Sequence, residues 1–142
     1  MSDFSRFMKQ NQIRKENTTY PATESLVDED GKALLWEIRP ITTSMNDAIV
    51  DECSYEVQVT GKPGLYRTKV NQSKLKAKVI CASVVYPNLH DKKLQDSYGV
   101  SSDIELIKEM IPTSGEYNRF VEFINDFNGF TSMQEDVDEA KN

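Results

Sequence analysis

The sequence has a single histidine, His90, and only two cysteines, Cys53 and Cys81, in 142 residues. A protein zinc site takes three or four ligands, usually closely spaced histidines or cysteines. A catalytic histidine needs a reacting partner and a group that orients it. Asp91 follows His90, but such a pair arises by chance in many proteins, and no P-loop, GxGxxG, GxSxG or CxxC motif occurs. The sequence predicts no catalytic residue, metal ligand or cofactor, and we expect a protein that is not an enzyme.

Long apolar runs are also missing from the sequence. No stretch approaches the roughly 20 apolar residues that cross a bilayer. The first residues, MSDFSRFMKQNQIRKE, lack the apolar core of a signal peptide. Two cysteines without motif spacing are typical of free buried thiols in a reducing compartment. We therefore expect a cytoplasmic protein with no membrane partner.

Acidic residues are absent between Gln58 and His90, although the chain as a whole carries 23 acidic and 17 basic side chains and a net charge of −6. This segment contains the basic residues Lys62, Arg67, Lys69, Lys74, Lys76 and Lys78. With Tyr66 as a stacking residue it is a candidate nucleic-acid surface, but the acidic balance of the chain argues against nucleic acid as a partner. The acidic end, residues 131–142, is predicted to be a flexible tail. It either meets the basic segment or faces a partner.

What the sequence does contain is a pattern of capped apolar segments. It predicts a mainly α protein with a small N-terminal β-hairpin (α+β), folded as a compact bundle of short helices. The hairpin turns at Asp30-Gly31, and Trp36 lies on the buried face of its second strand. Ser44 is the expected cap of the first core helix. Residues 55–67 form either a second small hairpin or an extension of that helix.

Four more helices are predicted in the second half of the chain, each marked by a capping residue or a breaker. They span residues 72–85 (cap Asn71, stop Pro87), 92–98 (cap Asp91, exit Gly99), 104–111 (cap Ser102 with Glu105, stop Pro112) and 114–128 (exit Gly129). The last helix carries an apolar stripe that includes Phe120, Val121 and Ile124. This stripe is expected to face the core.

Three parts are predicted along the chain: residues 1–19 as an N-terminal helix and polar linker, residues 20–130 as one globular domain, and residues 131–142 as the tail. Phe4, Phe7 and Met8 share one face of the N-terminal helix, which lies beyond the linker and is poorly placed to join the core. Phe123 lies away from the stripe of the last helix. These four residues are the candidate partner-binding residues, because exposed apolar side chains at such positions fit another polypeptide.

Two segments, LQDSYGV (94–100) and GEYNRFVEFINDFNGF (115–130), together with LLWEIRPIT (34–42), carry a resemblance to a known family. From Trp36 to Phe130 the chain resembles the XkdN-like tail assembly chaperones of long-tailed phages and prophages. The resemblance implies a protein made in the host cytoplasm that binds the tape-measure protein and keeps it soluble until tail-tube subunits polymerise around it. It also implies absence from the mature virion, with the tail-tube protein as a second partner.

A different class of function is also compatible with a hairpin and short helices. The chain is alternatively a structural tail or head-tail connector protein that remains in the virion. Self-association is left open, as is the longer form that ribosomal frameshifting often produces in such families. The two functions differ in one simple respect, since only the connector is part of the finished particle.

Overall fold

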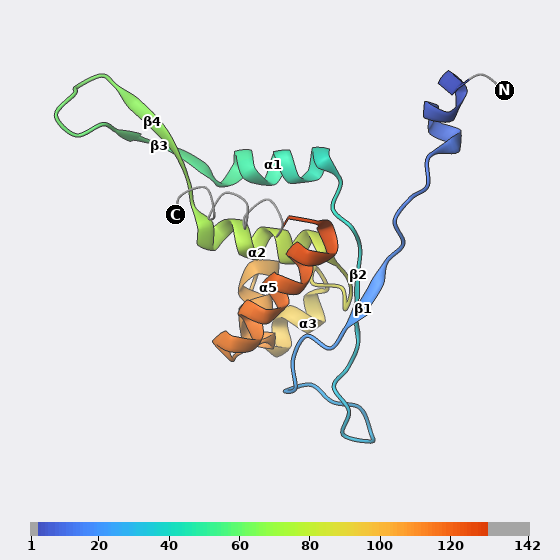
Figure 1. Ribbon diagram of the computed structural model, residues 1–142. Coiled ribbons are helices and arrows are strands. Elements are labelled where there is room, and N and C mark those ends of the chain that lie inside the picture. The colour runs from blue at the N-terminus through green and yellow to red at the C-terminus, as the bar shows by residue number, and fades with distance from the viewer. Residues whose placement is uncertain (1–2, 131–142) are drawn as a thin grey trace.

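The computed structural model describes residues 3–130, which form a body of five α-helices and a three-stranded sheet with two projecting segments (Figure 1). The acidic tail predicted for residues 131–142 lies outside the described residues. The helices are α1 (Thr43–Cys53), α2 (Gln72–Ser83), α3 (Lys92–Ser97), α4 (Asp103–Met110) and α5 (Ser114–Asn128). The strands are β1 (Thr18–Tyr20), β2 (Trp36–Ile38), β3 (Ser54–Gln58), β4 (Tyr66–Val70) and β5 (Val84–Tyr86), and two short 3₁₀ helices, η1 (Asp3–Phe7) and η2 (Lys9–Asn11), precede them.

Most helix starts are fixed by the side chains that the sequence indicated. The oxygen atoms of Asn71, Asp91 and Ser102 accept hydrogen bonds from the backbone N–H groups three residues further on, at 3.1, 2.9 and 3.1 Å. These bonds satisfy N–H groups that have no partner within their helix. The exceptions are α1 and α5. Helix α1 begins two residues earlier than expected, because Thr42 rather than Ser44 accepts the bond from Met45 N. At the start of α5, the cap residue Thr113 makes no side-chain capping hydrogen bond.

The fold class expected from the sequence is wrong in its β content. The strands do not form an N-terminal hairpin alone: they make two antiparallel sheets, one ordered β1-β2-β5 and the other β3-β4. The expected turn at Asp28–Gly31 does form, with a single bridge between Val27 and Ala33. The strand that pairs with Trp36, however, lies further upstream, with Tyr20 opposite Trp36 and Thr18 opposite Ile38.

The third strand of this sheet comes from a segment that the sequence assigned to a helix. Helix α2 ends at Ser83, and Val84–Tyr86 pairs with β2 instead of completing the helix as far as residue 85. Arg39 holds this end, since its backbone N–H donates to Ser83 O and its Nε to Ala82 O, both at 2.8 Å. Long-range hydrogen bonds to β2 and Arg39 thus replace the next helical turn.

The second sheet is the hairpin that the sequence left open as an alternative to a longer α1. Strands β3 and β4 pair in register from Ser54 opposite Val70 to Gln58 opposite Tyr66. The hairpin follows α1 directly and leads directly into α2, and it extends away from the body (Figure 1). No residue of either strand is buried.

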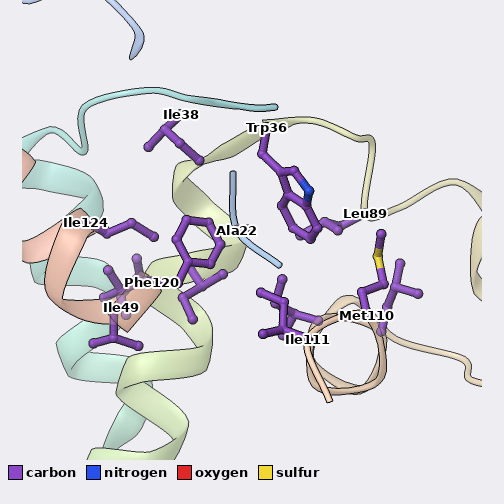
Figure 2. Close-up of a cluster of buried hydrophobic side chains, with 14 of the residues drawn as sticks. Ala22, Trp36, Ile38, Ile49, Leu89, Met110, Ile111, Phe120 and Ile124 are labelled. Carbon is purple, nitrogen blue, oxygen red and sulfur yellow. The ribbon is translucent and has the colours of Figure 1, made fainter. Parts of the chain in front are cut away.

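The core lies where α2, α4 and α5 meet the three-stranded sheet (Figure 2). Phe120 of α5 is fully buried and meets the Trp36 ring edge-on, with 5.7 Å between the ring centroids. Ile38, Ile80, Leu106 and Ile107 are also fully buried. The stripe predicted on the last helix is confirmed, because Phe120, Val121 and Ile124 are its three buried residues.

A carboxylate ties the loop after β1 to this body. Glu116, in the first turn of α5, accepts hydrogen bonds from the Thr23 hydroxyl at 2.8 Å and from Glu24 N at 2.7 Å. The Glu24 N–H and then the Thr23 hydroxyl stabilise the charged form, so the pKa of Glu116 lies below its ordinary value. The loop is therefore held against the start of α5.

Candidate partner-binding surface

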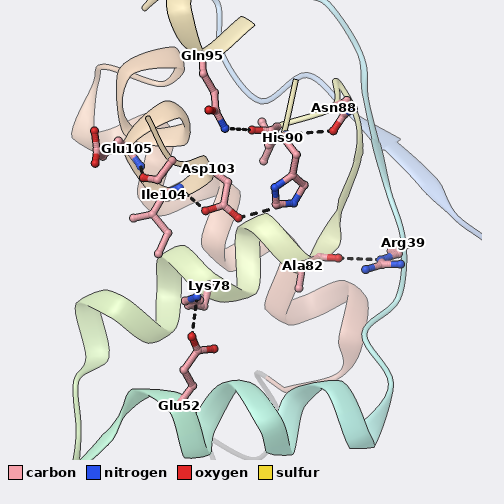
Figure 3. Close-up of polar contacts among 12 residues, drawn as sticks. Arg39, Glu52, Lys78, Ala82, Asn88, His90, Gln95, Asp103, Ile104 and Glu105 are labelled. Atoms are coloured by element: carbon pink, nitrogen blue, oxygen red, sulfur yellow. Dashed lines mark hydrogen bonds and ion pairs between the residues drawn. The ribbon is translucent and has the colours of Figure 1, made fainter. Parts of the chain in front are cut away.

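The histidine that stood out in the sequence sits in a structural contact. His90 is largely exposed, and its Nε2 lies 3.9 Å from Asp103 Oδ2 at the start of α4 (Figure 3). Burial, with Asp103 nearby, raises the pKa of the neighbouring Cys81 thiol to about 12, which keeps the thiol protonated and a poor nucleophile at neutral pH. Within residues 3–130 no group of three or more His, Cys, Asp or Glu side chains is arranged to hold a metal ion. The contact between His90 and Asp103 joins the loop before α3 to the start of α4.

The three N-terminal candidates lie on a segment that projects from the body (Figure 1). Phe4 and Phe7 are 75% and 85% exposed, and Met8 is 44% exposed. Hydrogen bonds between residues close in the sequence hold η1 and η2, including Met8 N to Ser5 O at 3.2 Å and Asn11 N to Met8 O at 2.9 Å. The expected helix is present as 3₁₀ turns, in which residues three apart eclipse each other. Phe4 and Phe7 therefore present their rings on the same side.

The base of this arm is fastened to the end of α5. The Lys15 ammonium donates a hydrogen bond to Phe127 O and lies 4.3 Å from the centroid of the Phe127 ring. Phe127 stacks on Phe123 with the ring planes 2° apart, and Phe123 stacks on Tyr20 at a centroid distance of 4.1 Å. Each of these aromatic rings is only partly buried.

The fourth candidate, Phe123, is thus at the base of the arm and packs against the edge of the core. The structure does not bring it into contact with Phe4, Phe7 or Met8, but Lys15 and Phe127 connect the two groups. We call the combined set the arm surface: Phe4, Phe7, Met8, Tyr20, Phe123 and Phe127. Tyr20 was not among the sequence candidates, because its role depends on contacts with residues about a hundred positions away.

Two further exposed apolar regions were not among the candidate partner-binding residues predicted from the sequence. One is a hollow of about 200 Å³ beside the Asp28 turn, lined by apolar side chains that include Leu26, Leu34, Leu35, Tyr86, Pro87 and Leu94. The other is the β3-β4 hairpin, where Tyr55, Leu65 and Tyr66 are about half exposed. In the sequence, both regions are marked only by apolar residues in segments that are too short to form a core of their own.

The chain also matches a known protein family. The model of the phage XkdN-like tail assembly chaperone protein matches residues 4–141. The chain belongs to the XkdN-like phage tail assembly chaperone family. The family resemblance seen in the sequence is thereby confirmed, and membership of a chaperone family implies a non-catalytic role.

Individual relatives of the XkdN-like family agree with this assignment. The chain is 29% identical over 142 residues to phage-like element PBSX protein XkdN of Bacillus subtilis (strain 168), covering 99% of this chain and 94% of that protein. It is 27% identical over 138 residues to the protein YqbN of the same organism, covering 97% and 91%. The crystal structure of a protein YqbN matches the fold with a TM-score of 0.73 at 24% identity, covering 92% of this chain and 98% of that one.

No helix within residues 3–130 of this XkdN-like chaperone has both the length and the apolar character needed to span a bilayer.

Proposed function

We propose that this chain binds the tape-measure protein and keeps it soluble during phage tail assembly, acting in the host cytoplasm and leaving before the virion is complete. The observation that carries the proposal is the projecting segment of this tail assembly chaperone, on which the large apolar side chains of Phe4, Phe7 and Met8 are left exposed. Large apolar side chains exposed together are typical of sites that bind another polypeptide. The tail-tube protein is the second partner in this proposal.

The geometry of the arm surface suits an amphipathic helix of the tape-measure protein. In this proposal the exposed rings of Phe4 and Phe7 contact the apolar face of such a helix. Apolar anchors at helical spacing are the usual means by which a groove recognises a helix. Because no residue of η1 is buried, the arm is free to pack on a client without disturbing the core.

Co-expression with the tape-measure protein of the same gene cluster tests this function. The unmodified chain is expected to move the tape-measure protein from the pellet to the soluble fraction and to co-purify with it. The double variant Phe4→Ser, Phe7→Ser is expected to lose most of this effect. Ile13→Ser is the matched control, since Ile13 is equally apolar and 95% exposed but lies outside the arm surface. Unchanged solubility of the tape-measure protein with the unmodified chain would refute the proposal.

Mass spectrometry of purified particles separates the chaperone from a tail or connector protein. A chaperone is expected to be missing from mature virions, whereas a connector is present at a fixed number of copies. Finding the chain in stoichiometric amount would overturn the proposed departure from the particle.

A further inference from the structure

The β3-β4 hairpin has one face on which basic and apolar side chains are combined. Residues alternate between the two faces of a strand pair, so the pairs Tyr55–Lys69 and Val57–Arg67 lie on the same face. The next pair is joined by the 2.8 Å hydrogen bond from Val59 N to Leu65 O. We call this set the cationic face: Tyr55, Val57, Val59, Leu65, Arg67 and Lys69. The one acidic residue of the hairpin, Glu56, pairs with Thr68 on the other face.

This face has no partner of its own within the described residues. An isolated two-stranded hairpin is marginally stable in water and normally needs a third strand or a helix to pack against. Here every residue of β3 and β4 is at least partly exposed, and the hairpin extends beyond α1 and α2 (Figure 1). A cationic, apolar face in this position is built to contact another surface.

The opposite end of the molecule carries a surface of complementary chemistry. The turn after Val27 contains Asp28, Glu29 and Asp30, and with Glu24 and Lys32 the segment 24–32 has four acidic and one basic residue, a net charge of −3. Asp28 shapes the turn, since its Oδ1 accepts from Asp30 N at 2.8 Å and from Lys32 N at 3.0 Å. The Glu29 and Asp30 side chains are exposed and belong to no ion pair among residues 3–130.

Apolar side chains flank this turn as they flank the basic residues of the hairpin. Leu34 and Leu35 are 43% and 59% exposed and open onto the apolar hollow beside the turn. The hairpin and the acidic turn, at opposite ends of the molecule, thus each combine charged side chains with exposed aliphatic groups. The charge is positive on the hairpin and negative on the turn. We define the acidic face as Glu29, Asp30, Leu34 and Leu35.

The helical body separates the two faces, because the hairpin and the turn lie at opposite ends of the molecule (Figure 1). One copy cannot bring them together without unfolding. We propose that the cationic face of one copy docks on the acidic face of a second copy. Leu65 and Val59 enter the hollow beside Leu34 and Leu35, and Arg67 and Lys69 pair with Glu29 and Asp30.

A contact between two different faces is heterologous, so each copy keeps one unused face and assembly continues into a ring or an open chain. Successive copies arranged in this way would cover a long client. The proposed contact between copies does not involve the tape-measure protein. Its test is therefore independent of the test of the proposed function.

Sedimentation velocity of the purified full chain, without any partner, tests the contact. Oligomers are expected to grow with concentration and to shrink when salt is raised from about 0.05 M to 1 M, because the screening length falls to ~3 Å. A monomer at every concentration, or a symmetric dimer that does not grow further, would overturn the proposal.

Charge exchange tests which faces meet. The variants Arg67→Glu, Lys69→Glu and Glu29→Lys, Asp30→Lys each set like charges opposite one another, and each is expected to weaken association more than about tenfold. Mixing the two variants, or combining all four changes in one chain, restores opposite charges and is expected to restore association. The control Lys76→Glu, Lys108→Glu changes the net charge in the same direction and by the same amount as Arg67→Glu, Lys69→Glu, but on exposed parts of α2 and α4, and is expected to leave association unchanged.

Each variant is first checked for an unchanged melting temperature by circular dichroism. Among residues 3–130, the side chains of Glu29, Asp30, Arg67 and Lys69 make no hydrogen bond or ion pair, so folding is expected to be preserved. Failure of the mixed variants to associate, when both are folded, would refute the assignment of the two faces.

Discussion

In the helical body, Ile80, Ile107 and Phe120 are completely buried, whereas no residue of η1, β3 or β4 is buried. The two kinds of region share similar residue types, since phenylalanine and valine occur in both. Their difference lies in the layers around them: α5 is covered by α2 and the sheet, but the arm and the hairpin each lack a covering element. The body therefore supplies stability, and the projecting segments are available for binding.

The largest expected effect comes from the centre of the body. Phe120→Ala removes a ring that contacts Trp36 and, at 5.5 Å between centroids, Tyr20. Loss of a fully buried aromatic side chain is expected to lower the free energy of unfolding by ~3–5 kcal/mol. Urea denaturation followed by circular dichroism measures this change. A loss below about 1 kcal/mol would mean that this ring does not lie at the core.

A backbone position in the body gives the next largest effect. Gly99 follows α3 with φ at +68°, a conformation that strains residues with a Cβ atom. Gly99→Val is expected to cost ~1–3 kcal/mol of stability. The contrasting variant is Gly115→Ala, whose position in α5 has ordinary backbone angles and whose new Cβ would lie 3.4 Å from the flexible Arg119 side chain. Equal destabilisation by both variants would exclude the left-handed conformation as the cause.

A helix cap of the body is expected to contribute less. Asp91→Ala removes the oxygen that accepts from Leu94 N, at a cost of about 1 kcal/mol. Asp91→Asn keeps a side-chain acceptor and should retain most of the stability. Thermal unfolding compares the three proteins, and equal melting temperatures for the alanine variant and the parent would argue against the cap.

The carboxylate that fastens the loop to α5 gives a pH-dependent effect. The pKa of Glu116 is lowered in the folded state, so its contribution to stability is present above the ordinary value of 4.5 and is lost as pH falls through the folded pKa. Glu116→Gln should therefore be less stable than the parent at neutral pH, with the difference narrowing in acid. Melting temperatures from pH 7 downwards, plotted for both proteins, check this. A constant difference would contradict the role of the charge.

The smallest effect on stability is expected in the arm. Phe7→Ser replaces a ring that is 85% exposed, so the free energy of unfolding should change by no more than ~0.5 kcal/mol. The same denaturation experiment as for Phe120→Ala measures it, which makes the two phenylalanines a direct comparison of body and projection. A loss as large as that of Phe120→Ala would show that the arm packs into the core.

The sequence was informative wherever structure depends on neighbours along the chain. The caps at Asn71, Asp91 and Ser102 and the glycine exit at Gly99 were predicted, because each depends on residues within one turn. The exposure of Phe4 and Phe7 also followed from their place beyond a polar linker. The partner-binding role of these residues and of Phe123 stays a prediction.

Contacts between distant residues could not be read from the sequence in the same way. Lys15 donates a hydrogen bond to Phe127, 112 residues further along the chain, and so anchors the arm. No local sequence pattern predicts this pairing. The basic residues of the hairpin were visible in the sequence as a segment without acidic residues. That they lie at the opposite end of the body from the acidic turn was not visible, because this depends on how the helices and the sheet pack.

The sequence by itself determined the capped helix starts at Asn71, Asp91 and Ser102 and the exposure of the apolar side chains beyond the polar linker. Only the tertiary structure decided the conformation of Val84–Tyr86, which continues the apolar pattern of α2 but lies beside β2. Glu37 and Ile38 pair with this segment, and Arg39 donates to Ser83 O and Ala82 O just before it, in place of a further helical turn. The choice between helix and strand therefore depended on partners more than forty residues away, which local propensity does not contain.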